Sequence, residues 1–154
     1  MGSKRKSSLV KTKSGNLVKS FSEARVDDWF YANGYRTIYE PTIELGGNDF
    51  VPDWLILPND STVLRPILVE YWGLLREGHV ADWVIQRRER YSLRKEIKED
   101  TYGASQAYDF IGIMPSQLDD PHEFDRWMRE QLQVLLRRAY LSRFSSVDLS
   151  QIEV

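Results

Sequence analysis

The sequences VPDWLIL (residues 51–57) and ILVEYWG (residues 67–73) decide the fold of this chain. Each is an apolar run rich in β-branched and aromatic residues, which predicts a buried strand, and each carries one acidic residue. If the two strands form an antiparallel hairpin, Asp53 and Glu70 lie near the same end of the sheet. A buried carboxylate without a partner costs several kcal/mol. The pair therefore indicates a site for a hard divalent cation, which prefers oxygen ligands.

The patterns on either side of these runs complete an α/β domain. Ser20 and Glu23 have the spacing of a capping box, which predicts a helix that starts there and ends at Asn33-Gly34. The other expected elements are strands over residues 35–45, 50–57, 62–72 and 107–114, a turn at 46–49, and helices over residues 80–100 and 124–144. Strands joined by short turns, followed by a helical crossover, predict a mixed four-stranded sheet flanked by helices, with an additional C-terminal helix.

Composition is that of a single globular domain. The 154 residues can bury one core, and we expect a flexible basic arm over residues 1–19, one domain over 20–145 and a polar tail over 146–154. The chain has no cysteine and two histidines, so carboxylates are the expected metal ligands, which favours Mg²⁺ or Mn²⁺. The sequence shows no signal peptide or membrane span. We therefore expect an intracellular protein, cytoplasmic or nucleoid-associated, without membrane contact.

Basic residues form two groups, although the formal net charge is −2. Such groups are candidate contacts to the phosphates of DNA. The alternative is a solubilising tail and a solvated helix face. The first group contains Lys4, Arg5, Lys6, Lys11 and Lys13, and the second contains Arg87, Arg88, Arg90 and Arg94.

The order and spacing of these motifs resemble the PD-(D/E)XK nuclease superfamily. The resemblance covers roughly residues 18–115 and rests on short motifs at residues 18–23, 34–35, 39–41, 51–55 and 69–73. It is closest to the branch with a Glu-Tyr-Trp-Gly third motif, known as free-standing proteins and as segments attached to helicases. The resemblance implies a restriction-endonuclease-like αβββαβ core and a Mg²⁺-dependent endodeoxyribonuclease.

The resemblance also implies a set of site residues. Asp53 and Glu70 would bind Mg²⁺ or Mn²⁺, with the backbone carbonyl of Tyr71 as a further ligand. Glu23 would face the metal, in some members through water, although a glutamate at this position of a capping box also has a purely structural explanation. The superfamily usually has a lysine two residues after the third-strand glutamate, where this chain has Trp72.

In this branch the following helix supplies the catalytic lysine. Lys95 is the best match, because it lies four residues after Tyr91 and so on the same helical face. Lys98 and Arg94 are alternative donors, and Gln86 is a second polar candidate for the pocket. If Trp72 faces the cleft, it is expected to form an apolar wall or to stack on a base.

Three functions remain open from the sequence. The first is an endonuclease that hydrolyses DNA phosphodiester bonds in DNA repair, recombination or a mobile element, acting as a homodimer or larger symmetric homo-oligomer through the helix at 124–144. The second is a catalytically inactive nucleic-acid-binding module on the same fold, suggested by the missing lysine. The third is a small interaction protein whose acids cap strands or pair with arginines.

Overall fold

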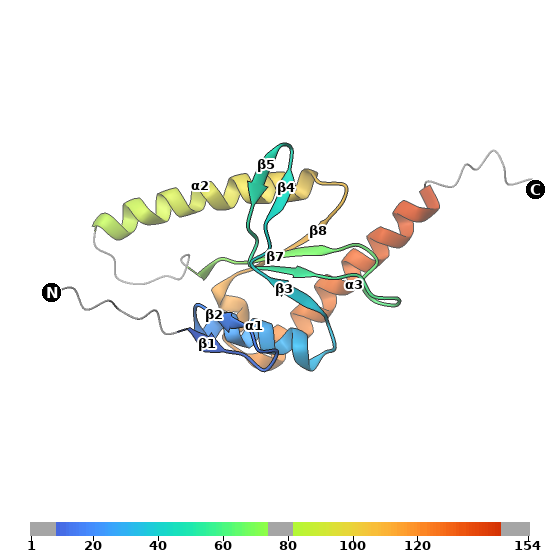
Figure 1. Cartoon of the computed structure of the whole chain (residues 1–154), viewed down its shortest axis with the longest axis horizontal. Helices are drawn as coiled ribbons and strands as arrows, with labels where there is room; N and C mark the ends of the chain where they lie inside the picture. Colours follow the sequence, from blue (N-terminus) through green and yellow to red (C-terminus); the bar gives the residue numbers. More distant parts are fainter. Residues whose placement is uncertain (1–8, 74–81, 146–154) are drawn as a thin grey trace, which may run out of the picture.

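Three helices and a four-stranded sheet form the body of the protein (Figure 1). The computed structural model describes residues 9–73 and 82–145. The helices are α1 (Phe21–Ala32), α2 (Asp82–Ala104) and α3 (Pro121–Ser145). The sheet contains β3 (Thr37–Tyr39), β6 (Trp54–Ile56), β7 (Ile67–Tyr71) and β8 (Asp109–Ile113), in that spatial order. The pairs β3–β6 and β6–β7 are antiparallel and β7–β8 is parallel, so the expected mixed α/β architecture is confirmed.

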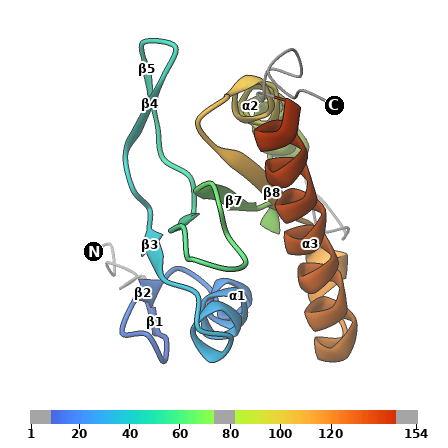
Figure 2. The ribbon, with the colours of Figure 1, turned by 90° about the vertical axis from the view of Figure 1, so that its right-hand side faces the viewer.

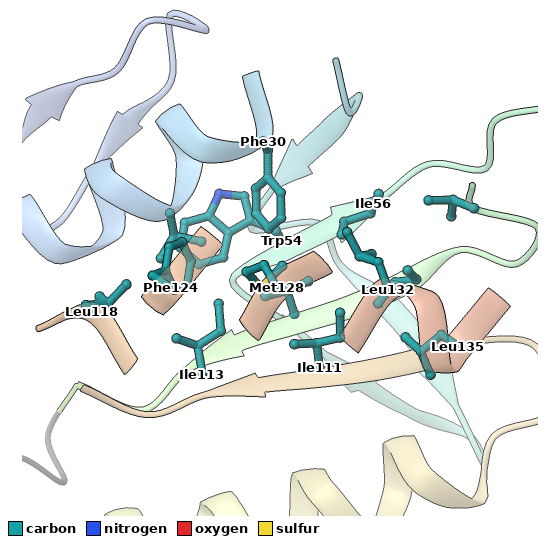
Figure 3. Packing of buried hydrophobic residues seen from close by; sticks show 14 residues of the cluster. Phe30, Trp54, Ile56, Ile111, Ile113, Leu118, Phe124, Met128, Leu132 and Leu135 are labelled. Carbon is teal, nitrogen blue, oxygen red and sulfur yellow. The ribbon is translucent and has the colours of Figure 1, made fainter. Parts of the chain in front are cut away.

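The sheet is covered on both faces. Figure 2 shows α2 on one side of the sheet, with α1 and α3 covering the other. Because successive strand residues point to opposite faces, Trp54 and Ile56 pack towards α1 and α3, where Phe30 and Met128 meet them (Figure 3). Leu55 points the other way and packs in a smaller cluster that contains buried residues from α2 and β7. The apolar cluster on the α2 side of the sheet is therefore the smaller of the two, and this side carries Glu70.

The first expected strand, residues 35–45, is divided into two. Glu40 has a φ of 47°, an unfavourable backbone conformation for a residue with a Cβ, and Pro41 has no N–H to give to a sheet. Strand β4 (Ile43–Leu45) therefore leaves the main sheet and pairs with β5 (Asn48–Phe50). The resulting hairpin projects beside the C-terminal half of α2 (Figures 1 and 2).

Several boundaries differ from the sequence expectations. Residues 48 and 49 belong to β5, because the turn is centred on Gly46 and Gly47, whose φ values of 60° and 84° suit a tight hairpin turn. The expected strand 50–57 is interrupted at residues 51–53, before β6 begins. The other strands are shorter than expected, and α2 and α3 are longer at one or both ends.

A short hairpin precedes α1, where we expected a flexible arm to residue 19. Its strands, β1 (Val10–Lys11) and β2 (Leu17–Val18), are antiparallel. The buried carboxylate of Asp27 holds the hairpin against the body, because it accepts hydrogen bonds from Ser14 Oγ (2.6 Å), Asn16 Nδ2 (2.8 Å) and Trp54 Nε1 (3.1 Å). Burial opposes ionisation of Asp27, but these donors outweigh it and lower its pKa. Residues 9–19 are therefore part of the folded body.

Helix α3 extends beyond the sheet (Figure 1). One face of α3 is buried against the core, from Phe124 to Ala139, whereas Val134, Tyr140 and Leu141 are exposed. The expected role of this helix in an oligomer remains a prediction. In the part of the chain that the structure describes, α3 and the other helices lack the length or hydropathy needed to cross a membrane.

Candidate active site

Two acidic residues meet at one end of the β6–β7 hairpin. The register pairs Trp54 with Val69, so Asp53, one residue earlier, stands opposite Glu70, one residue later. Asp53 Oδ2 accepts the backbone N–H of Tyr71 at 2.7 Å, and the carboxyl groups of Asp53 and Glu70 are close enough to hydrogen-bond to each other. The side chain of Glu70 is only 3% exposed. The structure thus brings together the two acids that the sequence singled out.

Glu23 approaches this pair from the first turn of α1. Its backbone N–H donates to Ser20 Oγ at 3.1 Å, as a capping box requires. Its Oε2 accepts the backbone N–H of Lys19 at 3.1 Å, and its Oε1 accepts the hydroxyl of Tyr39 at 3.3 Å. The negative charges of Glu23 and Asp53 also interact. Glu23 therefore serves the helix cap and belongs to the acidic cluster at the same time.

The electrostatics of the cluster disfavour full ionisation. Burial raises the pKa of Asp53 to about 7, and the charge of Glu70 adds to the shift. Burial also raises the pKa of Glu23, with the charge of Asp53 as the second cause. Burial raises the pKa of Glu70 as well, although the charge of Lys98 opposes the shift. Three carboxyl groups that resist carrying charge together would each be favoured in the ionised form by a nearby cation.

Lys98, rather than Lys95, contacts the acidic cluster. Lys98 Nζ lies 2.9 Å from Glu70 Oε1, and it also contacts the backbone carbonyl of Val51 at 3.3 Å. Lys95 instead pairs with Glu99 and lies 5.5 Å above the ring of Trp72. The structure therefore moves the leading lysine assignment by one turn of α2, from Lys95 to the alternative donor Lys98.

Tyr102 is a site neighbour that the sequence analysis did not select. Its hydroxyl donates to Glu70 Oε1 at 3.0 Å, and its ring is buried. Lys98 and Tyr102 are four residues apart, so they share a face of α2. The repeated spacing of Tyr91, Lys95, Lys98 and Tyr102 was the available sequence signal for a helix face directed at the sheet.

Trp72 is an interior residue beneath α2. It is buried, and its ring packs edge-on against Tyr91 with centroids 6.0 Å apart. A Cβ on Gly112 of β8 would lie 3.0 Å from Trp72 Nε1, so the absence of a side chain there makes room for the indole. The ring is therefore inaccessible to a base, and it fills the space between sheet and helix.

An open pocket lies beside the acids. Its volume is about 500 Å³. The residues that line it come from the start of α1, the ends of β6 and β7, and α2: Lys19, Ser20, Ser22, Glu23, Asp53, Tyr71, Gly73 and Tyr91. The hydroxyl of Tyr91 donates to the backbone carbonyl of Tyr71 at 3.4 Å, the carbonyl that the resemblance implies as a metal ligand. Glu23 and Asp53 are thus the acids that a ligand in the pocket would meet first.

The donor chemistry of the site fits a hard divalent cation. Within residues 9–73 and 82–145, no three acidic or histidine side chains are already arranged around a common point as ligands. Asp53 and Glu23 nevertheless line the pocket with carboxylate side chains, and Tyr71 lines it as well. Because Glu70 Oε1 is held by Lys98 and Tyr102, Glu70 would bind through its other oxygen. Hard oxygen donors of this kind suit Mg²⁺ or Mn²⁺.

The expected DNA-contacting residues are distributed over two surfaces. Lys11 and Lys13 are exposed on the N-terminal hairpin, and Lys4, Arg5 and Lys6 lie outside the described residues. On α2, the side chains of Arg87, Arg90 and Arg94 are exposed and that of Arg88 is half-buried. Gln86 belongs to α2, but its side chain lies outside the described part of the chain.

Comparison with known proteins adds no relative to this picture. No family model, curated protein or solved structure matches the chain.

The raised pKa of Asp53 predicts how stability depends on pH. Its pKa rises from an ordinary 3.8 to about 7 on folding, so between these pH values the folded state binds more protons than the unfolded state. The free energy of unfolding should therefore fall as the pH rises from about 4 to about 7, by about 1–3 kcal/mol. Urea denaturation in EDTA at several pH values would measure the free energy of unfolding. Asp53→Asn should flatten the slope, and an unchanged slope in that variant would contradict the assignment.

Proposed function

We propose that this protein is a metal-dependent endonuclease that hydrolyses phosphodiester bonds of DNA on a restriction-endonuclease-like αβββαβ core. The observation that carries the proposal is the cluster of Glu23, Asp53 and Glu70, with Lys98 on Glu70, at the edge of an open pocket. The element order α1-β3-β6-β7-α2-β8 in the main sheet and its flanking helices supports the same assignment. Perturbed acids gathered in a pocket are characteristic of functional sites.

Each residue of the acidic cluster has a distinct role in the proposed mechanism. Asp53, Glu70 and the Tyr71 carbonyl would hold Mg²⁺ or Mn²⁺, and Glu23 would complete the acidic wall. A bound divalent ion supplies Lewis-acid stabilisation of the charge that develops on the scissile phosphate. Lys98 opposes the effect of burial on Glu70 and so favours its ionised, metal-binding form.

Surface residues would supply the affinity for DNA. Exposed arginines on α2 and exposed lysines on the N-terminal hairpin offer contacts to backbone phosphates. Phosphate contacts of this kind are independent of base sequence. The domain would therefore bind DNA with strong salt dependence, and action on both strands of a duplex would require two copies of the site, as in a symmetric homo-oligomer.

The alternative function is a nucleic-acid-binding module without catalysis. The contact between Lys98 and Glu70 favours it, because a lysine can neutralise one buried acid and stabilise the fold without any metal. The two functions differ in the response to divalent ions. A binding module would retain DNA affinity, would not cleave DNA in Mg²⁺ or Mn²⁺, and would show no specific stabilisation by either ion.

Thermal denaturation tests the proposed metal site directly. Saturating Mn²⁺ should raise the melting temperature of the wild-type protein by several degrees, because a ligand that binds only the folded state stabilises it. Glu23→Gln should reduce this shift, and Asp60→Asn, at an exposed turn residue, should not. The same preparations would be incubated with supercoiled plasmid in Mg²⁺ or EDTA. Stabilisation without nicking would support the metal site but contradict the nuclease function. Absence of both stabilisation and nicking would refute the metal site and favour the binding module.

A further inference from the structure

The most exposed large apolar side chain among the described residues belongs to a segment whose other residues line the acidic pocket. Phe21 is 79% exposed and occupies the first turn of α1. Its neighbours in the chain, Ser20 and Ser22, both line the pocket, as does Glu23. A single exposed apolar residue is common on protein surfaces, but this ring lies within two residues of an acid of the proposed site.

A cationic side chain accompanies the ring. Lys19 lines the same pocket, and its positive charge interacts with those of Glu23 and Asp53. Its side chain is 67% exposed and pairs with Glu40 at 2.8 Å. Because a lysine ammonium has three N–H donors and this side chain is largely exposed, Lys19 can contact a phosphate while it keeps its bond to Glu40.

An exposed aromatic ring and a cation two residues apart in the chain match the chemistry of one class of ligand. Proteins that bind single-stranded nucleic acid stack unpaired bases on aromatic rings and hold the neighbouring phosphates with basic groups. In a duplex, the faces of the bases are covered by their neighbours, so a surface phenylalanine has no base face to meet. Trp72 cannot take this role because it is buried.

We propose that Phe21 and Lys19 receive an unpaired strand segment at the mouth of the pocket. Phe21 stacks on an unpaired base, and Lys19 binds an adjacent phosphate. The strand then runs past Glu23 and Asp53. The position of the cleaved bond rests on the proposed nuclease function, whereas the binding preference does not. The preferred substrates are DNAs with unpaired nucleotides beside the cleaved bond, such as flaps, forks and single strands.

Fluorescence anisotropy in EDTA tests the proposal without cleavage. A labelled single-stranded oligonucleotide and the corresponding blunt duplex would be titrated with wild type, Phe21→Ala, Phe21→Tyr and Lys19→Gln. Tyr31→Ala is the matched control, because Tyr31 is an exposed aromatic residue at the other end of α1. Phe21→Ala should weaken single-strand binding about tenfold and leave duplex binding and the salt dependence unchanged. Phe21→Tyr should retain binding, and Lys19→Gln should reduce the slope of log K against log salt by about 0.7.

The outcomes separate this inference from the nuclease proposal. If Phe21→Ala loses single-strand binding and Tyr31→Ala does not, the inference is supported even if wild type never cleaves DNA. Equal binding by Phe21→Ala and wild type would overturn it, and so would equal losses in Phe21→Ala and Tyr31→Ala. If Phe21→Ala changed the molar mass measured by light scattering but not DNA affinity, Phe21 would belong to a protein contact. If wild type cleaved flap and duplex substrates at equal rates, and Phe21→Ala did the same, the nuclease proposal would be supported and the inference refuted.

Discussion

Replacing Asp53 by asparagine is expected to reduce Mg²⁺-dependent cleavage of DNA by about 10³-fold. The amide removes the negative charge that would hold a divalent cation. Its oxygen can still accept the N–H of Tyr71, which Asp53 Oδ2 accepts at 2.7 Å in the wild type. The end of the β6–β7 hairpin should therefore keep its structure while the chemistry is lost. Initial rates of plasmid nicking at saturating Mg²⁺ measure the effect.

Stability measurements separate this result from simple unfolding. Burial and the charge of Glu70 raise the pKa of Asp53, so the ionised carboxylate destabilises the folded protein. The Asp53→Asn variant, with a neutral amide, should therefore have the same melting temperature as wild type in EDTA, or a higher one. Asp60→Asn, at an exposed turn residue, should cleave like wild type. Wild-type cleavage by Asp53→Asn would place the chemistry elsewhere in the chain.

The second large effect is expected at Lys98. Lys98→Gln should reduce cleavage by about 10²-fold, whereas Lys95→Gln should reduce it less than about tenfold, because Lys95 contacts Glu99 and Trp72 rather than Glu70. Lys98→Gln should also lower the free energy of unfolding at neutral pH by about 1–3 kcal/mol. This is less than for a fully buried pair, since Lys98 is 27% exposed.

A double substitution distinguishes catalysis from stability. Glu70→Gln in the Lys98→Gln background removes the buried charge that was left unpaired, so most of the lost stability should return. Cleavage should fall below that of Lys98→Gln, because the carboxylate that would bind the metal is gone. If Lys95→Gln proved the more damaging single change, the catalytic lysine would be the one first expected from the sequence.

The local sequence pattern was sufficient to predict the β6–β7 hairpin and the position of its two acids, Asp53 and Glu70. Strand periodicity and an antiparallel turn leave few registers that keep Trp54, Ile56 and Val69 on the apolar face. Any such register sets Asp53 opposite or nearly opposite Glu70. The N-terminal cap of α1 could also be predicted from neighbouring residues, because Ser20 and Glu23 interact within one helical turn.

Long-range packing decided the remaining features of the site. Lys95 and Lys98 both lie on the sheet-facing side of α2, and the choice between them depends on how the helix docks over β7, which no local pattern encodes. Trp72 is buried because Gly112, forty residues later, leaves space for its ring. The N-terminal hairpin is folded because Asp27, once buried, requires donors from residues 14 and 16.

Sequence pattern therefore determined the β6–β7 hairpin, the α1 cap and the pairing of Asp53 with Glu70, since these follow from side-chain periodicity and contacts between close neighbours. Docking of α2 and of the N-terminal hairpin determined which lysine meets Glu70, which aromatic ring remains exposed beside the pocket, and where the folded body begins. These outcomes depend on the fit of distant surfaces and on the hydrogen-bonding needs of buried charges, which appear only when the chain is packed.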